Sequence, residues 1–170
     1  MPSYLRGGVG LLALIAVLAF AGPAFASRSP VLGRVYVDDN TGGVNTISGY
    51  DRLADGALSP IPGSPFLAAG AGTDTSIASQ GAIQASTDGR YVLAVDAGSN
   101  QISVLRIRPD GTLRLVGDGV VGSRGSDPVS IAEHDGLVYV ANAGSGESNY
   151  TGFVLTRGGH LTQRTATLQA

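Results

Sequence analysis

The sequence predicts an all-β fold built from repeated units, because of its composition and of two landmarks that recur along the chain. The 170 residues include 26 Gly and no Lys, and Glu occurs only at Glu133 and Glu147. The solvent-facing residues that favour helices are therefore almost absent, whereas Val-rich runs and glycines are frequent. We expect strands joined by tight turns.

Three apolar runs, which form the first landmark, end in the same way. Each has Asp or Asn at its fifth position, followed by a small polar loop with glycine; these positions are Asp39, Asp96 and Asn142. The second landmark is a turn followed by Leu, at Asp55-Gly56, Asp110-Gly111 and Gly158-Gly159. The runs start 57 and 46 residues apart, and the turns lie 55 and 48 residues apart. A period near 50 with several short strands per unit is typical of a β-propeller.

The strands of one unit can be placed from the middle repeat. They are predicted at 82–86, 90–96, 101–108 and 112–117, which makes a four-stranded antiparallel meander with Asp-Gly hairpin turns. The units extend over 33–78, 79–127 and 128–170, with Gly- and Ser-rich connectors at 63–79 and 117–127. A β-sandwich is the alternative, which the paired landmarks disfavour.

The chain holds an incomplete arc of about two and a half to three such blades, whereas closed propellers typically have about four to eight. An unclosed arc exposes strand edges and apolar faces, which favours aggregation. Either the sequence is part of a longer protein, or copies assemble into a ring. We favour the first explanation, which predicts that this arc is poorly soluble when it is produced alone.

Residues 1–26 have the pattern of a secretory signal peptide. Arg6 gives a positive start, residues 9–22 are uncharged and apolar, and the segment ends in an A-x-A pattern at Ala24 and Ala26. The alternative is a retained membrane anchor, because about 20 apolar residues can span a bilayer. Pro23 and the small residues favour cleavage after Ala26. We therefore expect a secreted or periplasmic protein, residues 27–170, without membrane contact after cleavage.

Composition excludes several kinds of site and partner. Without cysteine there is no disulfide, thiolate metal site or cysteine-linked lipid anchor. A formal charge of −2 gives no basic surface, so no nucleic-acid partner is expected. No cofactor is predicted, and no metal site; oxygen ligands for a divalent cation are present but have no supporting motif.

The stretch "SQGAIQASTDGRYVLAVDAGSNQISVLRIRPDGTL", with "PVSIAEHDGLVYVANAG" and "NYTGFVL" after it, resembles the lactonase-type seven-bladed β-propeller family. Members are described as 6-phosphogluconolactonase-like or 3-carboxymuconate-cyclase-like, and the resemblance covers residues 33–165. It implies a propeller fold and, for some members, hydrolysis of a lactone.

Two motifs of the lactonase branch are altered in this sequence. The resemblance implies a Pro-His pair eight residues before the glycine of the turn at Gly89, where this chain has Gln80-Gly81. It also implies an acidic loop D-x-G-x-D, which here runs from Asp96 to Asn100 and so lacks its second carboxylate. These departures match an exported sub-branch with an "SQGA" opening, and they weaken the expectation of catalysis at this blade.

In a propeller meander, the loops between second and third strands lie on the same face as the connectors between blades, beside the central channel. We therefore expect one rim of carboxylates and amides that could bind a sugar, a lactone or a cation. The ligand-binding candidates there are Gln80, Asp96, Asn100, Asp127 and Asn142. The alternative is that Asp39, Asp96 and Asn142 cap strand ends by bonding nearby backbone N–H groups. Their recurrence in every unit favours that structural role.

The remaining residues that could carry chemistry are expected to be structural or exposed to solvent. His134 and His160 lie in turns on the face away from the rim and are expected to be exposed. Arg106 and Arg108 alternate with apolar residues, as on the solvent face of a strand. The sequence Asn149-Tyr150-Thr151 matches the N-glycosylation pattern, which matters only if the host glycosylates exported proteins.

The function predicted from the sequence is an exported propeller that binds a small-molecule ligand or a cell-surface partner through its channel rim. The alternative is a hydrolase or isomerase acting on a small lactone, with catalytic groups supplied by blades outside this chain. Whether the protein is an enzyme stays open at this point, and no catalytic residue is assigned.

Overall fold

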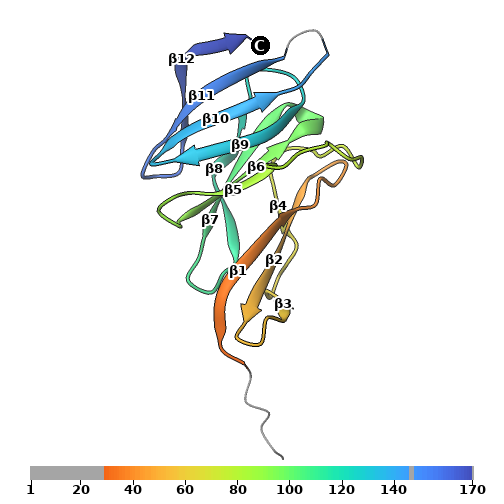
Figure 1. Cartoon of the computed structure of the whole chain (residues 1–170), viewed down its shortest axis with the longest axis vertical. Coiled ribbons are helices and arrows are strands. Elements are labelled where there is room, and N and C mark those ends of the chain that lie inside the picture. The colour runs from red at the N-terminus through yellow and green to blue at the C-terminus, as the bar shows by residue number, and fades with distance from the viewer. Residues whose placement is uncertain (1–28, 146–147, 170) are drawn as a thin grey trace, which may run out of the picture.

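The computed structural model describes residues 29–145 and 148–169, which form twelve strands and one short 3-10 helix. The strands make three four-stranded antiparallel sheets that follow one another along the chain (Figure 1). The predicted all-β propeller arc is thereby confirmed. Residues 1–28, where the signal peptide is predicted, lie outside the described residues.

The second sheet is a complete meander. Its strands are β5 (Ile83–Ala85), β6 (Tyr91–Asp96), β7 (Gln101–Ile107) and β8 (Leu113–Gly122), paired in chain order, and the 3-10 turn η1 (Ala97–Ser99) joins β6 to β7. The Asp-Gly turns form as predicted: Gly89 and Gly111 have φ of 68° and 88°, values that favour glycine. Asp110 Oδ1 also accepts a hydrogen bond from Thr112 N at 3.0 Å, which closes the second turn.

Strand β8 is longer than the sequence predicts. The prediction ended this strand at Gly117, but pairing continues to Gly122, opposite Gln101. Gly117 and Gly119 have φ of 57° and 74°, and the register of β7 against β8 shifts between Ser103 and Leu105. The glycines thus form a bulge, after which the strand resumes its pairing.

The third sheet repeats the meander with β9 (Pro128–His134), β10 (Leu137–Asn142), β11 (Asn149–Leu155) and β12 (Leu161–Gln169). Its first strand lies beside the first strand of the second sheet, because Gly81 and Ser130 form a parallel bridge and Ile131 N donates to Gly81 O at 2.7 Å. Strands β5 and β9 are therefore the innermost strands of their sheets.

The first sheet has no such innermost strand among the described residues. It consists of β1 (Val31–Asp38), β2 (Thr46–Leu53), β3 (Leu58–Pro60) and β4 (Phe66–Leu67), and both β3 and β4 pair with β2. Because β1 ends in the run that corresponds to β6 and β10, the described first sheet begins at the second strand of a blade.

Two apolar clusters hold the sheets together. Strand β6 is buried on both faces, since Val92 and Ala94 pack toward the first sheet with Ile47, and Leu93 and Val95 pack toward the third sheet. Burial of each Val, Leu or Ile side chain contributes about 1.5–3 kcal/mol. The middle sheet is therefore the core of the arc.

The outer faces of the first and third sheets lack this cover. Val37, at the third position of its run, is 43% exposed, whereas the corresponding Ala94 and Val140 are fully buried. On the third sheet, Tyr139 is 45% exposed while the corresponding Leu93 is fully buried. The arc thus ends in two apolar faces of the kind that other sheets cover, as expected of a chain that spans only part of a propeller.

In the part of the chain that the structure describes, we find no helix with the length and apolar character needed to cross a membrane.

Candidate functional site

The loops that follow the second strand of each sheet gather with the connectors between sheets at one end of the arc, the right-hand side of Figure 1. Ala71 N donates to Ser99 Oγ at 2.9 Å, and Asp127 N donates to Asn100 Oδ1 at 2.7 Å. We call this end the rim, consisting of residues 38–45, 68–82, 96–100, 123–127 and 142–148, of which 146 and 147 lie outside the described residues.

Asp96 is a buried structural carboxylate of the rim. Its side chain is fully buried, and Oδ2 accepts a hydrogen bond from Ser103 Oγ at 2.6 Å, while Oδ1 accepts one from Asn45 Nδ2 at 3.1 Å. Burial raises the pKa of Asp96, although the hydrogen bonds from Ser103, Asn45 and the Gly70 backbone oppose the shift. Asp96 therefore joins the first sheet, the connector and the second sheet.

Asn142 has the corresponding place in the third sheet. It is 3% exposed, and its Nδ2 donates to Asn149 Oδ1 at 2.7 Å and to Thr151 Oγ1 at 3.3 Å. Gly125 of the preceding connector packs against it, as Gly70 packs against Asp96. The bonds found for Asp96 and Asn142 thus run to side chains of neighbouring strands and, for Asp96, to the Gly70 backbone of the connector. Capping of nearby backbone N–H groups, which the sequence predicted, is not the way in which these two side chains are held.

The remaining candidates lie nearer the surface. Asn100 is exposed in the left-handed conformation with φ of 56°, and it holds the connector at Asp127. Gln80 is exposed directly before Gly81. A Cβ at Gly81 would lie 3.2 Å from Ile131 O, so this position is used for close approach of β5 and β9.

A polar hollow opens on the rim between the loop after β1 and the connector that leads to β5. Its volume is about 440 Å³, and its lining residues are Asp38, Asp39, Asn40, Asp74, Thr75, Ser76, Ile77, Ala78, Ser79 and Ala82. We call it the rim hollow. Ala82 directly precedes β5, and Asp38 ends β1, whose inner edge has no partner strand among the described residues. The hollow therefore lies at the inner end of the arc, where the repeat places the start of the first blade's innermost strand.

Asp38 is the residue of this hollow that the sequence analysis missed. Its Oδ1 accepts hydrogen bonds from Asn45 Nδ2 at 2.9 Å and Asn40 N at 3.1 Å, while Oδ2 is buried without a partner. Burial raises the pKa of Asp38 to about 6, and the negative charges of Asp96 and Asp39 add to the shift. The sequence does contain a sign that Asp38 is unusual. At the fourth position of the repeated apolar run, where the first run has Asp38, the other two runs have Val95 and Ala141.

The far wall of the hollow is fixed by hydrogen bonds to the loop after β1. Gly42 N donates to Asp74 Oδ1 at 2.6 Å, and Asn40 Nδ2 donates to Thr75 O at 2.6 Å. Thr73 N in turn donates to Asn40 Oδ1 at 2.9 Å. The connector and the loop therefore form one rigid wall that carries Asp74.

Metal binding has no geometric support here: within residues 29–145 and 148–169, no group of three or more Asp, Glu or His side chains is placed to hold an ion.

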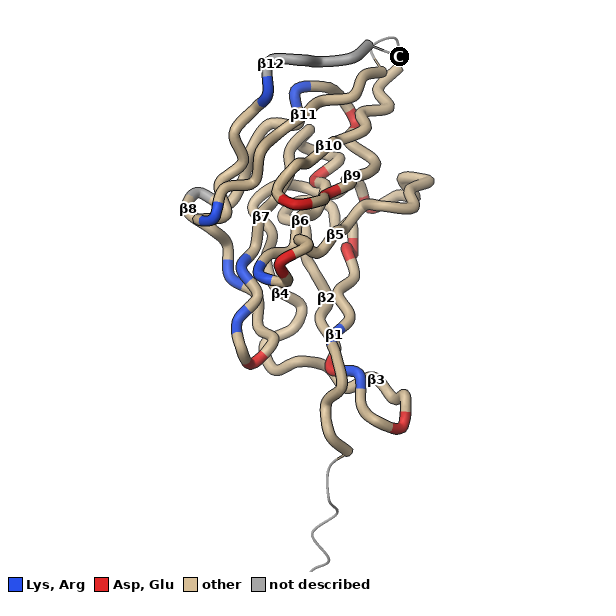
Figure 2. Tube along the Cα trace, turned by 60° about the vertical axis from the view of Figure 1, so that its left-hand side comes forward, with Lys and Arg blue, Asp and Glu red and all other residues tan. Residues whose placement is uncertain are grey.

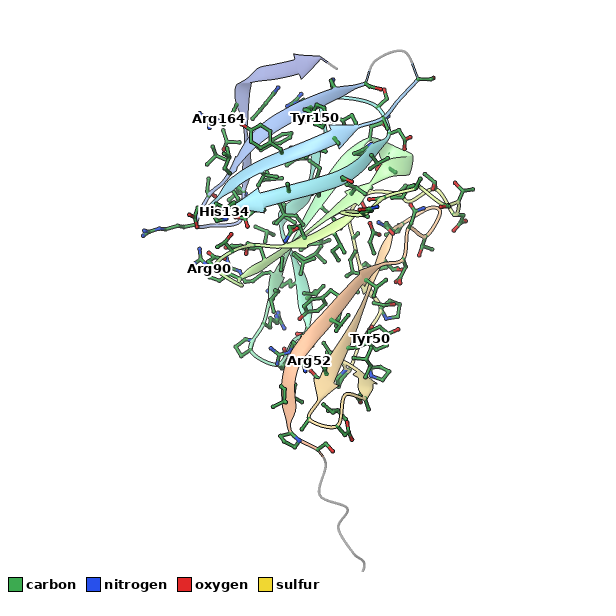
Figure 3. The ribbon with its side chains drawn as sticks, viewed as in Figure 1. Tyr50, Arg52, Arg90, His134, Tyr150 and Arg164 are labelled. Atoms are coloured by element: carbon green, nitrogen blue, oxygen red, sulfur yellow. The ribbon has the colours of Figure 1, made fainter. Side chains whose placement is uncertain are left out.

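The turns on the opposite face hold the other polar residues that the sequence singles out. The side chain of His134 is 84% exposed beside Asp135, and Figure 3 places His134 and Arg90 on the side away from the rim. Arg106 is exposed, as predicted, and its Nη2 donates to Tyr91 Oη at 2.7 Å. The glycosylation pattern is not free at the surface, because Thr151 is buried and bonds to Ser123 O.

The family of this chain follows from its match to a protein-family model. The model described as "Lactonase, 7-bladed beta-propeller" matches residues 36–169. The chain belongs to this lactonase family. The resemblance noted from the sequence is thereby confirmed. No functionally curated protein matches the chain by sequence.

Solved structures share the fold at low sequence identity. A candidate 6-phosphogluconolactonase of Bacteroides fragilis is 18% identical with a TM-score of 0.60, covering 81% of this chain and 36% of its own. The periplasmic gluconolactonase of Pseudomonas aeruginosa is 19% identical with a TM-score of 0.56, covering 74% and 34%. A protein of unknown function from Desulfotomaculum acetoxidans is 20% identical with a TM-score of 0.58, covering 79% and 41%. The chain therefore spans well under half of the length of these proteins.

Proposed function

We propose that the full-length protein hydrolyses a small lactone and that the polar residues around the rim hollow form part of its substrate site. The observation that carries the proposal is the match of residues 36–169 to the lactonase family, together with the polar rim on which these residues lie.

The chemistry of the hollow suits a ligand that is rich in hydroxyl groups. Asp39 and Asp74 offer carboxylate oxygens, and Thr75, Ser76 and Ser79 offer hydroxyl groups that donate and accept. A sugar lactone carries several hydroxyl donors, which carboxylates bind with charge-assisted hydrogen bonds. These residues would hold and orient the ring.

Hydrolysis of a lactone also needs a group that activates water and a donor that stabilises the oxyanion. The histidine implied by the lactonase branch is replaced by Gly81, and Asp96 is fully buried within the fold. We therefore assign the described residues to substrate binding, and we assign the acid–base groups to blades outside this chain.

A binding protein without catalytic activity is the second candidate. The specific observation in its favour is the Gln80-Gly81 pair, since Gly81 has no side chain where the lactonase branch has a histidine, and its backbone is bonded to β9. In that case the rim hollow would bind a sugar or a cell-surface glycan without converting it.

The two candidates are separated by assaying the full-length protein. A panel of five- and six-membered aldonolactones should be hydrolysed, with proton release followed in a weakly buffered solution. A well-folded full-length protein that binds these lactones without hydrolysing them would favour the binding protein. Asp96→Ala is unsuited to this purpose, because loss of its buried hydrogen bonds destabilises the fold itself.

A further inference from the structure

The inner edge of β1, on the side away from β2, has no partner strand within residues 29–145 and 148–169. At the end of this strand, Asp39 N donates to Thr46 O of β2 at 3.0 Å. Because the N–H groups of a strand point alternately to its two sides, Arg34, Tyr36 and Asp38 direct theirs toward the inner edge. These backbone groups form a row that is ready to pair with another strand.

The second and third sheets each have a strand at this edge. In the second sheet, Val95 N, which corresponds to Asp38 N, donates to Ala82 O at 2.9 Å. In the third sheet, β9 has seven residues and pairs antiparallel with β10. Strands β5 and β9 also meet through the bridge between Gly81 and Ser130. The repeat therefore places a further antiparallel strand between β1 and β5.

Two hollows mark the place of this strand. The rim hollow lies at one end, between Asp38 of β1 and Ala82 before β5. A second hollow of about 500 Å³ is lined by Val31, Leu32, Gly33, Arg34, Tyr36, Ala85, Gly89 and Ile107. Both hollows thus have β1 on one wall and β5 or its flanking residues on the other. One extended strand beside β1 would border both.

Strand β1 lacks the features that protect an edge strand which stays exposed. Such edges usually carry Lys or Pro, or are interrupted by bulges. From Gly33 to Asp38, β1 pairs regularly with β2 and contains neither Lys nor Pro, and Figure 2 shows few charges along it. Its charged side chains are bound to neighbours: Arg34 Nη2 donates to Pro109 O at 2.7 Å, and Asp38 Oδ1 accepts from Asn45 Nδ2 at 2.9 Å. The edge is therefore suited to pairing.

We propose that the C-terminal strand of the full-length protein, which follows residue 170, pairs with the inner edge of β1 and closes the ring. Since the described sheets follow one another along the chain, the strand that remains for the first sheet is the one after the last blade. The chain spans well under half of the length of its solved relatives, so a full-length protein of that size has the residues to supply it.

The segment directly before β1 is the other donor to consider. With a two-residue turn and seven residues, as in β9 and its turn to β10, the strand would occupy residues 22–28. This range crosses the predicted cleavage site after Ala26, and it contains Pro23, which has no N–H group for a strand ladder. These features favour the C-terminal strand.

Photo-crosslinking in the full-length protein identifies the donor. The probe p-benzoyl-phenylalanine replaces Leu32, which is 59% exposed and lines the second hollow. Peptide mapping by mass spectrometry should join position 32 to the C-terminal peptide of the full-length protein. The same probe at Arg114, an exposed residue of the outermost strand β8, is the control and should not reach that peptide. A crosslink from position 32 to residues 1–28 or to a second molecule would overturn the proposal.

Hydrogen exchange tests the pairing itself. In the full-length protein, the amides of Arg34, Tyr36 and Asp38 should exchange about a hundredfold more slowly, or slower still, than in a variant that lacks the C-terminal strand. The Val95 amide, which donates to Ala82 O in both proteins, is the matched control and should change little. Rapid exchange of the three amides in a full-length protein with a protected Val95 amide would contradict the pairing. If the shortened variant does not fold, the crosslink in the intact chain decides.

Discussion

Asn45 Nδ2 in the first sheet donates a hydrogen bond of 3.1 Å to Asp96 Oδ1 in the second sheet. The same amide group donates to Asp38 Oδ1 at 2.9 Å, while Asn45 Oδ1 accepts hydrogen bonds from Thr41 N and Thr46 N. One fully buried side chain therefore joins two sheets and shapes the loop that borders the rim hollow.

Asn45→Ala should destabilise the protein by about 2–4 kcal/mol, because it leaves buried carboxylates and backbone groups without partners. Urea denaturation of the full-length protein measures this. Asn100→Gly is the control: Asn100 is an exposed rim residue in the left-handed conformation with one hydrogen bond from Asp127 N, and Gly tolerates this conformation, so the substitution should cost about 1 kcal/mol or less. Equal effects of the two substitutions would contradict the central place given to Asn45.

Gly70→Ala should be strongly destabilising, since a Cβ at this position would lie 2.4 Å from Asp96 Cβ. The connector would have to move away from the second sheet, which costs about 1–3 kcal/mol or more. Gly122→Ala is the control, because a Cβ there meets no atom within 4 Å. Thermal unfolding midpoints of the two variants should differ clearly, with Gly122→Ala close to the wild type.

Stability should also depend on pH through Asp38. Its pKa is raised to about 6 in the folded protein, above its ordinary value of 3.8, so the folded state binds the proton more tightly than the unfolded state. The resulting stabilisation is complete below about pH 4 and is lost as pH rises through about 6. Asp38→Asn should flatten the change in urea midpoint between pH 4.5 and pH 7.5. Parallel pH profiles of wild type and variant would show that Asp38 does not titrate in this range.

The two uncovered end faces predict the behaviour of residues 27–170 when they are produced alone. Val37, Tyr139 and Tyr150 are 43%, 45% and 50% exposed, so the isolated arc should self-associate in size-exclusion chromatography with light scattering. Replacing Tyr139 and Tyr150 by Ser should shift it toward the monomer. Leu58→Ser, at an equally exposed apolar residue of β3, should have little effect. A monodisperse, stably folded monomer of the wild-type arc would contradict this account.

Export is a further prediction, which depends on the pattern of residues 1–26. N-terminal sequencing of the mature protein from the extracytoplasmic fraction should begin at Ser27. Replacing Ala24 and Ala26 by bulky residues should leave the precursor uncleaved. A cytoplasmic protein with an intact N-terminus would show this prediction to be wrong.

The fold was readable from the sequence because each repeat carries its own local signals. The period-two pattern around Val92, the turn at Asp88-Gly89 and the recurrence of both locate the strands without knowledge of distant contacts. The short strand β4 and the end of β8 were not readable, since the pairing of β4 with β2 and the bulge at Gly119 depend on neighbouring strands.

The rim was predicted as a location, but its chemistry was only partly predicted. Asp96 drew attention as a polar residue in a loop, yet Asn45, 51 residues away, decides that it is structural. Asp38 was overlooked because it stands beside Asp39, which fits the repeat. A charged residue where the other repeats have Val95 and Ala141 was the available signal.

The central claim, that the residues around the rim hollow bind a lactone substrate, is tested most directly by kcat/KM of full-length Asp74→Asn for glucono-1,5-lactone, since Asn keeps an oxygen for the hydrogen bond from Gly42 N. Loss of the charge on this hydrogen-bond acceptor should lower kcat/KM by about tenfold relative to the wild type, with the unfolding midpoint little changed. Wild-type kcat/KM in a folded Asp74→Asn protein would contradict the claim.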